Sequence, residues 1–350
     1  MRAAVYHGRC DVRLEDVPEP KARAGEVKLR VRYNGICGSD LHEYYHGPMT
    51  TRTSEPHPLT GVKNPVIMGH EFSGEVVDVG DGVTDLAKGD LVAVEPLETC
   101  GKCIHCKSGH YNHCALVAFH GYNREGGGLS DFTVVRRSMA HKLPPGVTAT
   151  QGALIEPMSV AYHTADRCRV DSGQTVAIHG AGPIGVGVHL ALRRRGVHTI
   201  VVDPSAARRA VLKALGAETC LDPNGIDVVS AIRDLTGGQG AHASVDAAGV
   251  PAAFRAALHG TRIDGTAVVV AIHGQPLVIP AFDILMPEVH ITGVAMFCNT
   301  FPKVIADMAA GAYPTTGWVE TIPFPELISN GFERLHRQEG MKLLVEISQQ

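Results

Sequence analysis

The first part of the chain carries short apolar runs that are bounded by glycine and proline. Valine-rich runs of strand length cover residues 3–6, 12–17, 26–33, 71–79, 90–95 and 131–136. Turn signals interrupt the series at residues 80–82 and 88–90. The pattern predicts an all-β, barrel-like domain. A segment rich in Pro, Thr and His, between residues 47 and 64, has no period and is expected to be a long loop.

Near residues 144–146 the pattern changes to alternating strands and helices. Helical spacing is found at residues 151–165, 184–195 and 206–215. Strand-like runs lie at 175–179, 199–203, 244–247, 266–272 and 291–294. This alternation predicts βαβ units, that is, a doubly wound parallel sheet with helices on both faces. After residue 297 the pattern is mixed again, and the chain has no internal repeat.

The length and this change of pattern together predict two domains. We expect residues 1–152 and 296–350 to form the β-rich domain and residues 153–295 to form the α/β domain. The fold class is therefore α/β, with a barrel-like part and a doubly wound part.

Composition narrows the expected partners and location. A net charge of −4 gives no electrostatic argument for a nucleic-acid partner. The first eleven residues carry charges where a signal peptide needs an apolar run. The longest apolar runs, such as residues 267–272, have the length of a strand and not of a membrane span. We expect a cytoplasmic protein without a membrane partner.

Four of the nine cysteines are clustered, which indicates metal rather than disulfides. Four thiolates at this spacing can close a tetrahedral shell around a structural zinc, in a lobe at about residues 96–116. The predicted ligands are Cys100, Cys103, Cys106 and Cys114. A closed shell leaves no position for a substrate, so His105, His110 and His113 are expected to be bystanders.

A glycine-rich turn follows the predicted strand at residues 175–179 and opens a predicted helix. Gly180 makes the tight turn, Gly182 lets the backbone approach a pyrophosphate, and Gly185 lets helix and strand pack closely. Pro183 and Ile184 stand at the helix N-terminus, where free N–H groups bind phosphate. The turn predicts a dinucleotide site.

Asp203 ends the next predicted strand. Its carboxylate is expected to accept hydrogen bonds from the adenosine ribose hydroxyls, which favours NAD because a 2′-phosphate would be repelled. Arg208 is a further candidate cofactor contact. Arg208 and Arg209 follow closely in the sequence, and their positive charges reduce the expected repulsion of the NADP 2′-phosphate by Asp203.

Residues 35–42 are the strongest candidate for the catalytic centre. Cys37 stands between two glycines, and Ser39 and His42 follow at offsets that could form a short proton path. The alternative is a glycine turn after a strand, with a buried structural cysteine. A catalytic zinc needs three protein ligands and one open position. Cys37, His70 and a carboxylate, either Glu71 or Glu156, would supply them.

Taken together, these motifs resemble the zinc-dependent medium-chain alcohol and polyol dehydrogenases, over essentially the whole chain. The residues that carry the resemblance are 35–42, 69–71, 156–157 and 180–185, with the four clustered cysteines. Residues 55–61 and 66–74 resemble more narrowly the (R,R)-2,3-butanediol dehydrogenases of that family.

The resemblance implies a GroES-like β-barrel catalytic domain closed by the C-terminal segment, with a Rossmann domain inserted. It places Cys37 and His70 on a catalytic zinc, with Glu156 as third ligand and Glu71 exchanging or binding through water. It makes Ser39 and His42 a proton relay through the nicotinamide ribose. It also implies a homodimer or homotetramer, with the strand near residues 291–294 as a pairing edge.

The function expected from this is hydride transfer between NAD(H) and a small vicinal diol or hydroxyketone, such as 2,3-butanediol and acetoin. Within the family, a sugar-alcohol dehydrogenase for sorbitol or xylitol, or a threonine dehydrogenase, is the alternative. From other classes, the alternatives are a zinc-free NADPH quinone reductase, a non-enzymatic relative, and a nucleic-acid binder with a Cys₄ finger. The last lacks any basic stripe.

Overall fold

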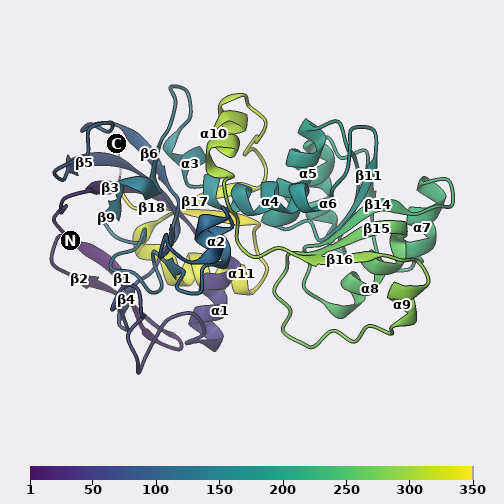
Figure 1. Ribbon diagram of the computed structural model, residues 1–350, viewed down its shortest axis with the longest axis horizontal. Helices are drawn as coiled ribbons and strands as arrows, with labels where there is room; N and C mark the ends of the chain where they lie inside the picture. Colours follow the sequence, from purple (N-terminus) through teal and green to yellow (C-terminus); the bar gives the residue numbers. More distant parts are fainter. Residues whose placement is uncertain (349–350) are drawn as a thin grey trace. The chain divides into compact units, whose positions relative to one another are not determined.

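The computed structural model describes residues 1–348, and the chain divides into two compact units (Figure 1). The first unit comprises Met1–Glu156, Phe301–Ala310 and Thr315–Gln350, and the second comprises Pro157–Thr300 and Gly311–Pro314. The domain boundaries expected from the sequence, 152/153 and 295/296, lie a few residues before these divisions.

The first unit is built on a seven-stranded sheet with the order β10-β6-β5-β3-β18-β17, in which β9 also pairs with β3. Its strands are β3 (Glu26–Gly35), β5 (Glu71–Val79), β6 (Leu91–Val94), β9 (Phe132–Arg136), β10 (Ala140–Lys142), β17 (Val319–Pro323) and β18 (Lys342–Glu346). A second sheet contains β2 (Asp11–Asp16), β1 (Arg2–Gly8) and β4 (Val66–Ile67), and a third contains β7 (Leu97–Glu98) and β8 (Ala118–Phe119). The helices of this unit are α1 (Gly38–His46), α2 (Ile104–Lys107), α3 (Ala149–Gly152), α10 (Phe301–Ala309) and α11 (Glu333–His336).

The C-terminal segment completes the main sheet of this unit. Figure 1 shows the yellow strands β17 and β18 beside the blue N-terminal strands. β18 is antiparallel to β3, with Leu344 opposite Gly35. Leu29, Phe72 and Leu343 pack into one core of fully or almost fully buried side chains. Burial of such side chains stabilises the fold by about 1.5–3 kcal/mol each, so the sheet depends on both ends of the chain.

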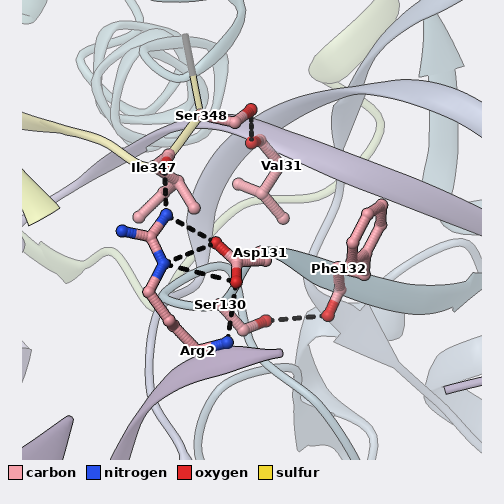
Figure 2. A network of polar contacts seen from close by, with 7 residues as sticks. All are labelled: Arg2, Val31, Ser130, Asp131, Phe132, Ile347 and Ser348. Atoms are coloured by element: carbon pink, nitrogen blue, oxygen red, sulfur yellow. Dashed lines mark hydrogen bonds and ion pairs between the residues drawn. The ribbon is translucent and has the colours of Figure 1, made fainter. Parts of the chain in front are cut away.

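Figure 2 shows polar contacts that join the start of the chain and the last described residues to the residue before β9 and to β3. The Arg2 guanidinium donates to Asp131 at 2.7 Å and to the carbonyl of Ile347 at 3.0 Å. The Ser348 hydroxyl donates to the carbonyl of Val31 at 2.7 Å. These bonds hold the end of β18 beside β3.

The second unit contains one parallel sheet with the order β13-β12-β11-β14-β15-β16. Its strands are β11 (Thr175–His179), β12 (His198–Val202), β13 (Thr219–Leu221), β14 (Ala241–Asp246), β15 (Thr261–Val269) and β16 (His290–Gly293). Its helices are α4 (Ile155–Arg167), α5 (Pro183–Arg194), α6 (Ala206–Ala214), α7 (Val228–Leu235), α8 (Pro251–Gly260) and α9 (Phe282–Leu285). This strand order is that of a Rossmann domain, so the predicted fold class is confirmed.

Alternation along β11 explains why helices cover both faces of this sheet. Ile178 packs on one face with Leu192 of α5, and Ala177 packs on the other with Ile232 of α7. Successive side chains of a strand point to opposite faces, so a strand that is apolar at every position must be covered twice.

Three details differ from the expectation. The helix expected at residues 151–165 is two helices, α3 and α4. α3 is closed at its start by a capping box between Thr148 and Gln151. Residues 38–46 form the helix α1, where the sequence indicated only a turn. The short strand β13 and the helices α7 and α8 were not predicted.

Among residues 1–348, no helix has both the length and the hydropathy needed to cross a bilayer.

Candidate active site

The first unit brings Cys37, His70 and Glu71 into one group, with one ligand atom of each within 4.8 Å of the others. Cys37 lies between β3 and α1, directly before the helix. His70 precedes β5, and Glu71 is the first residue of that strand. Pairing of β3 with β5 places Gly35 opposite Glu71. Ligands around one zinc ion lie about 4 Å from each other, so the group fits a thiolate, an imidazole and a carboxylate on zinc.

Lys342 is the cation of this buried region. It lies on β18, and its ammonium donates to Glu71 Oε2 and, at 2.9 Å, to the carbonyl of Ile36. Burial alone would lower the pKa of Lys342, but Glu71 and Cys37 raise it above its ordinary value. A Cβ atom on Gly35 would lie 2.2 Å from Glu71 Oε2. The ion pair therefore needs glycine at this position.

Asp40 supports the imidazole of His70. Its side chain is fully buried, with Oδ2 accepting from the Cys37 amide at 2.9 Å and Oδ1 lying 3.4 Å from His70 Nδ1. Burial opposes the charged form of His70, but Asp40 and Cys37 raise its pKa well above 6.5. The 3.4 Å contact is an ion pair and does not meet the geometry of a hydrogen bond; it places the carboxylate on the Nδ1 side and leaves Nε2 as the nitrogen that can bind a metal.

Glu156 is buried near this group but is not among its three members. Burial raises the pKa of Glu156 to about 8; Glu71 and Asp40 add to the rise, while His70 and Lys342 oppose it. Several buried carboxylates beside a thiol leave negative charge that a divalent cation would neutralise. Of the two candidate carboxylates, the structure groups Glu71 with Cys37 and His70 and places Glu156 outside the group.

Ser39 and His42 both belong to α1. They are three residues apart and therefore on one face of the helix. The Ser39 Oγ lies 2.9 Å from the Tyr122 hydroxyl. The His42 ring lies beside that of His46, with centroids 6.1 Å apart.

Sequence reasoning missed three residues of the site: Asp40, Tyr122 and Lys342. Asp40 could have been found, because it stands three residues after Cys37, where a helix-capping acid is common. Tyr122 and Lys342 had no signal in the sequence, since only pairing of distant segments brings them to the site.

The four clustered cysteines form a second group. Cys103 and Cys106 have their sulfurs 3.5 Å apart, and Cys100 and Cys106 have theirs 3.9 Å apart. With Zn–S bonds of about 2.3 Å, the edge of a tetrahedral Cys₄ shell is about 3.8 Å long, which these distances match. Backbone amides lower the pKa of Cys100 to about 6, whereas burial raises that of Cys114 to about 11.

The cysteine lobe is shaped for thiolate ligands. The amides of Cys100 and Leu116 donate to Cys114 Sγ, each at 3.4 Å, and the amide of Cys106 donates to Cys103 Sγ at 3.5 Å. His105 and His113 lie with ring centroids 6.2 Å apart and are not in the four-cysteine group. The lobe fits a closed structural zinc site.

The glycine-rich turn of the second unit lies between β11 and α5. Gly180 has φ +106°, and a Cβ there would meet the carbonyl of Ala247 at 2.9 Å. A Cβ on Gly185 would lie 1.9 Å from the carbonyl of Gly180. Gly182 has open space, as a close approach of phosphate requires. Pro183 and Ile184 begin α5.

Asp203 follows β12 and is buried. Its two carboxylate oxygens accept from the amides of Ala181, at 2.7 Å, and Ser205, at 2.8 Å. These bonds fix the acid to the glycine-rich turn and leave lone pairs for ribose hydroxyls.

The two neighbouring arginines differ. Arg209 donates to the Asp203 carbonyl at 2.6 Å and pairs with Asp222 at 2.9 Å. Arg208 is half-buried, and its amide donates to the Ser205 hydroxyl at 3.3 Å. The guanidinium of Arg209 is therefore occupied by groups of the protein itself.

Comparison with known proteins gives consistent results along the chain. The model of the alcohol dehydrogenase GroES-like domain matches residues 23–145, and that of the zinc-binding dehydrogenases matches residues 183–310. The (R,R)-butanediol dehydrogenase of Bacillus subtilis (strain 168) is 38% identical over 99% of both chains. The sorbitol dehydrogenase of the same organism is 34% identical, over 99% of this chain and 97% of its own. The crystal structure of 2R,3R-butanediol dehydrogenase from Bacillus subtilis superposes with a TM-score of 0.94, at 37% identity and 99% coverage of both chains.

Proposed function

The chain belongs to the zinc-binding alcohol and polyol dehydrogenases, and within that family we propose that it transfers a hydride between NAD(H) and a small vicinal diol or hydroxyketone. The substrate pair that we favour is 2,3-butanediol and acetoin. The proposal rests on one observation above all, the buried group of Cys37, His70 and Glu71.

In the proposed mechanism, Cys37 and His70 would hold a zinc ion, and Glu71 and Glu156 are the carboxylates that could complete its shell. Bound zinc would supply a Lewis acid that lowers the pKa of a coordinated hydroxyl. Lys342 pairs with Glu71 and holds it in place, and Asp40 lies beside the His70 ring.

Ser39 would accept the proton of the substrate hydroxyl. As it does so, Ser39 would release its own hydroxyl proton toward His42, which lies three residues along the same face of α1. The site thus removes a proton on the α1 side while the hydride leaves the carbinol carbon. The redox chemistry itself belongs to the nicotinamide.

We propose NAD as the cofactor because Asp203 sits at the end of β12 with its carboxylate held toward the glycine-rich turn. A 2′-phosphate at this place would meet a fixed negative charge. Arg209, a neighbouring cation, is already paired with Asp222.

The loop at residues 47–65 supports the diol assignment through its resemblance to butanediol dehydrogenases. Glu43 of α1 holds the first half of the loop, because its carboxylate accepts hydrogen bonds from the Thr50 amide at 2.8 Å and the Thr51 hydroxyl at 2.6 Å. Thr60 donates to the carbonyl of Asn123 at 2.5 Å, and His57 is buried. Each half of the loop is therefore hydrogen-bonded to the rest of the first unit.

A sugar alcohol is the second candidate substrate, because sorbitol dehydrogenases are also about one-third identical over the full chain. Steady-state assays with NAD⁺ and NADP⁺ on butanediol stereoisomers, sorbitol, xylitol and threonine would decide. The highest kcat/KM is expected for a butanediol isomer with NAD⁺. A preference for sorbitol or threonine would refute the diol assignment, and zinc-independent quinone reduction would refute the dehydrogenase mechanism.

We also propose that the chain forms a homodimer or homotetramer. β16 is an edge strand of the parallel sheet. Phe282, Leu285 and Met286 expose 73%, 64% and 68% of their surface on the segment that precedes this strand. Pairing of β16 with the same strand of a second copy would cover such an edge. Light scattering should then give a dimer or tetramer, and a monomer at micromolar concentration would contradict this.

A further inference from the structure

Tyr122 touches three groups of the candidate site without belonging to the metal group. Its hydroxyl lies 2.9 Å from Ser39 Oγ and 2.8 Å from Asp40 Oδ1. Its ring centroid is 5.1 Å from that of His70. The side chain is 3% exposed. It follows β8 in a turn in which its amide donates to the carbonyl of Phe119 at 3.1 Å.

The Tyr122 hydroxyl has one proton and two neighbouring acceptors. A carboxylate is the stronger acceptor, so the proton points to Asp40. An ordinary phenol is protonated at neutral pH, so the Tyr122 hydroxyl has this proton to donate. Asp40 cannot turn away, because its other oxygen accepts from the Cys37 amide.

The direction of the second hydrogen bond follows from the first. Because the Tyr122 hydroxyl donates its only proton to Asp40, its oxygen can only accept a second hydrogen bond. The Ser39 hydroxyl is therefore the donor to Tyr122. A serine side chain has three staggered orientations, and this bond selects one of them. The Ser39 oxygen then offers a lone pair to the substrate proton on the side away from Tyr122. When that proton arrives, the Ser39 hydroxyl releases its own proton, which leaves the hydrogen bond to Tyr122 and passes toward His42.

We propose that Tyr122 is a positioning residue that holds the Ser39 hydroxyl as a proton acceptor for the substrate. The order of bonds is Ser39 to Tyr122 to Asp40, and Asp40 also contacts the Nδ1 of His70. Tyr122 thereby ties the proton acceptor to the metal group. This role rests on the proposed function, because it presumes that Ser39 receives the hydroxyl proton.

The Tyr122→Phe variant tests the proposal, because it removes the hydroxyl and keeps the ring beside His70. We expect kcat to fall about tenfold, the usual scale for one hydrogen bond, with the KM for NAD⁺ unchanged and zinc content unaltered. Tyr33→Phe is the matched control, since the Tyr33 hydroxyl meets Glu346 at 3.3 Å, and it should leave kcat as it is.

A double-mutant cycle separates positioning from a general structural role. If Tyr122 acts through Ser39, then Ser39→Ala combined with Tyr122→Phe should be as slow as Ser39→Ala alone. Multiplicative losses in the double variant would overturn the proposal, as would an unchanged kcat in Tyr122→Phe.

A crystal structure of zinc-loaded Tyr122→Phe gives a reading that does not depend on turnover. Ser39 should occupy more than one orientation, while the contact between Asp40 and His70 persists. One unchanged Ser39 orientation would refute the proposal. If the unmodified enzyme prefers another alcohol, the diol assignment fails and the cycle is measured on that alcohol. If no alcohol is oxidised, the proposed function fails, and the Ser39 orientation in Tyr122→Phe still tests whether Tyr122 positions the Ser39 hydroxyl.

Discussion

Lys342 donates a buried hydrogen bond to Glu71, although 271 positions of the chain separate the two residues. The side chains are 2% and 1% exposed, so water cannot screen the pair or replace either partner. β18 carries the lysine and β5 the carboxylate, and both strands pair with β3, one on each side. The pair thus joins the C-terminal strand directly to the candidate metal group.

Loss of the lysine should be severe. Lys342→Met leaves Glu71 as an uncompensated buried charge, a change that costs about 3–5 kcal/mol of unfolding free energy in comparable sites. Denaturant unfolding of the first unit, followed by Trp318 fluorescence, would measure it. Arg337→Ala removes an exposed partner of Glu339 and is the control that should leave the midpoint unchanged. Equal midpoints for the two variants would contradict the prediction.

Gly35→Ala should reduce activity and zinc binding together. The added methyl group would lie 2.2 Å from Glu71 Oε2 and 3.0 Å from the Lys342 side chain, so one of the two must move. A drop in kcat of at least tenfold is expected, with loss of the metal bound near Cys37. Gly8→Ala meets nothing within 4 Å and should behave as the unmodified enzyme.

The two metal groups should be separable by stoichiometry. Metal analysis is expected to give about two zinc ions per chain, one closed and one open site. Cys37→Ser should retain about one zinc and NAD binding but lose turnover, since it removes only a ligand of the open site. Cys103→Ser should lose the other zinc and lower the thermal midpoint. Cys220→Ser, outside both groups, should keep both ions; full activity of Cys37→Ser would refute the catalytic assignment.

Cofactor choice should change in two steps. Asp203→Ala removes the carboxylate that excludes a 2′-phosphate, so the ratio of kcat/KM for NAD⁺ to that for NADP⁺ should fall about tenfold or more. Asp222→Ala releases the Arg209 guanidinium and should favour NADP⁺ further when the two changes are combined. Asp234→Ala, an exposed acid on α7, is the control. Preference for NADP⁺ in the unmodified enzyme would show that the role given to Asp203 is wrong.

Stability should fall as the pH drops from 6.5 toward 4, because His179 is buried as a neutral imidazole. Burial lowers its pKa from 6.5 to about 4, so over this range the unfolded chain binds a proton that the folded chain does not. One such group contributes a slope of about 1.4 kcal/mol per pH unit, with its stabilisation fully present above pH 6.5. The slope of the unfolding free energy of His179→Asn against pH should be smaller by this amount. An identical slope would contradict the assignment.

The sequence by itself determined the features that depend on local spacing. Residues 180–185 needed only a strand before them and a helix after them to predict the dinucleotide turn, and the alternation from residue 175 onward predicted the parallel sheet, which the strand order confirms. The four cysteines of the lobe fall within 15 residues, so their spacing alone predicted a common metal group, and the structure brings their sulfurs together.

The tertiary structure decided what depends on pairing between distant segments. No local pattern indicated that Lys342 would neutralise Glu71, or that Tyr122 would meet Ser39 and Asp40, because these contacts arise from strand register and from a turn after β8. The residues alone left Glu71 and Glu156 as candidates for the third ligand, and the resemblance favoured Glu156; which of the two binds zinc stays a prediction. Register places Glu71 opposite Gly35 and beside Cys37, whereas Glu156 approaches the same region from α4. The alternation of side chains along a strand determines which residues share a face of the sheet. Only the pairing register between strands determines which residues of distant segments lie side by side.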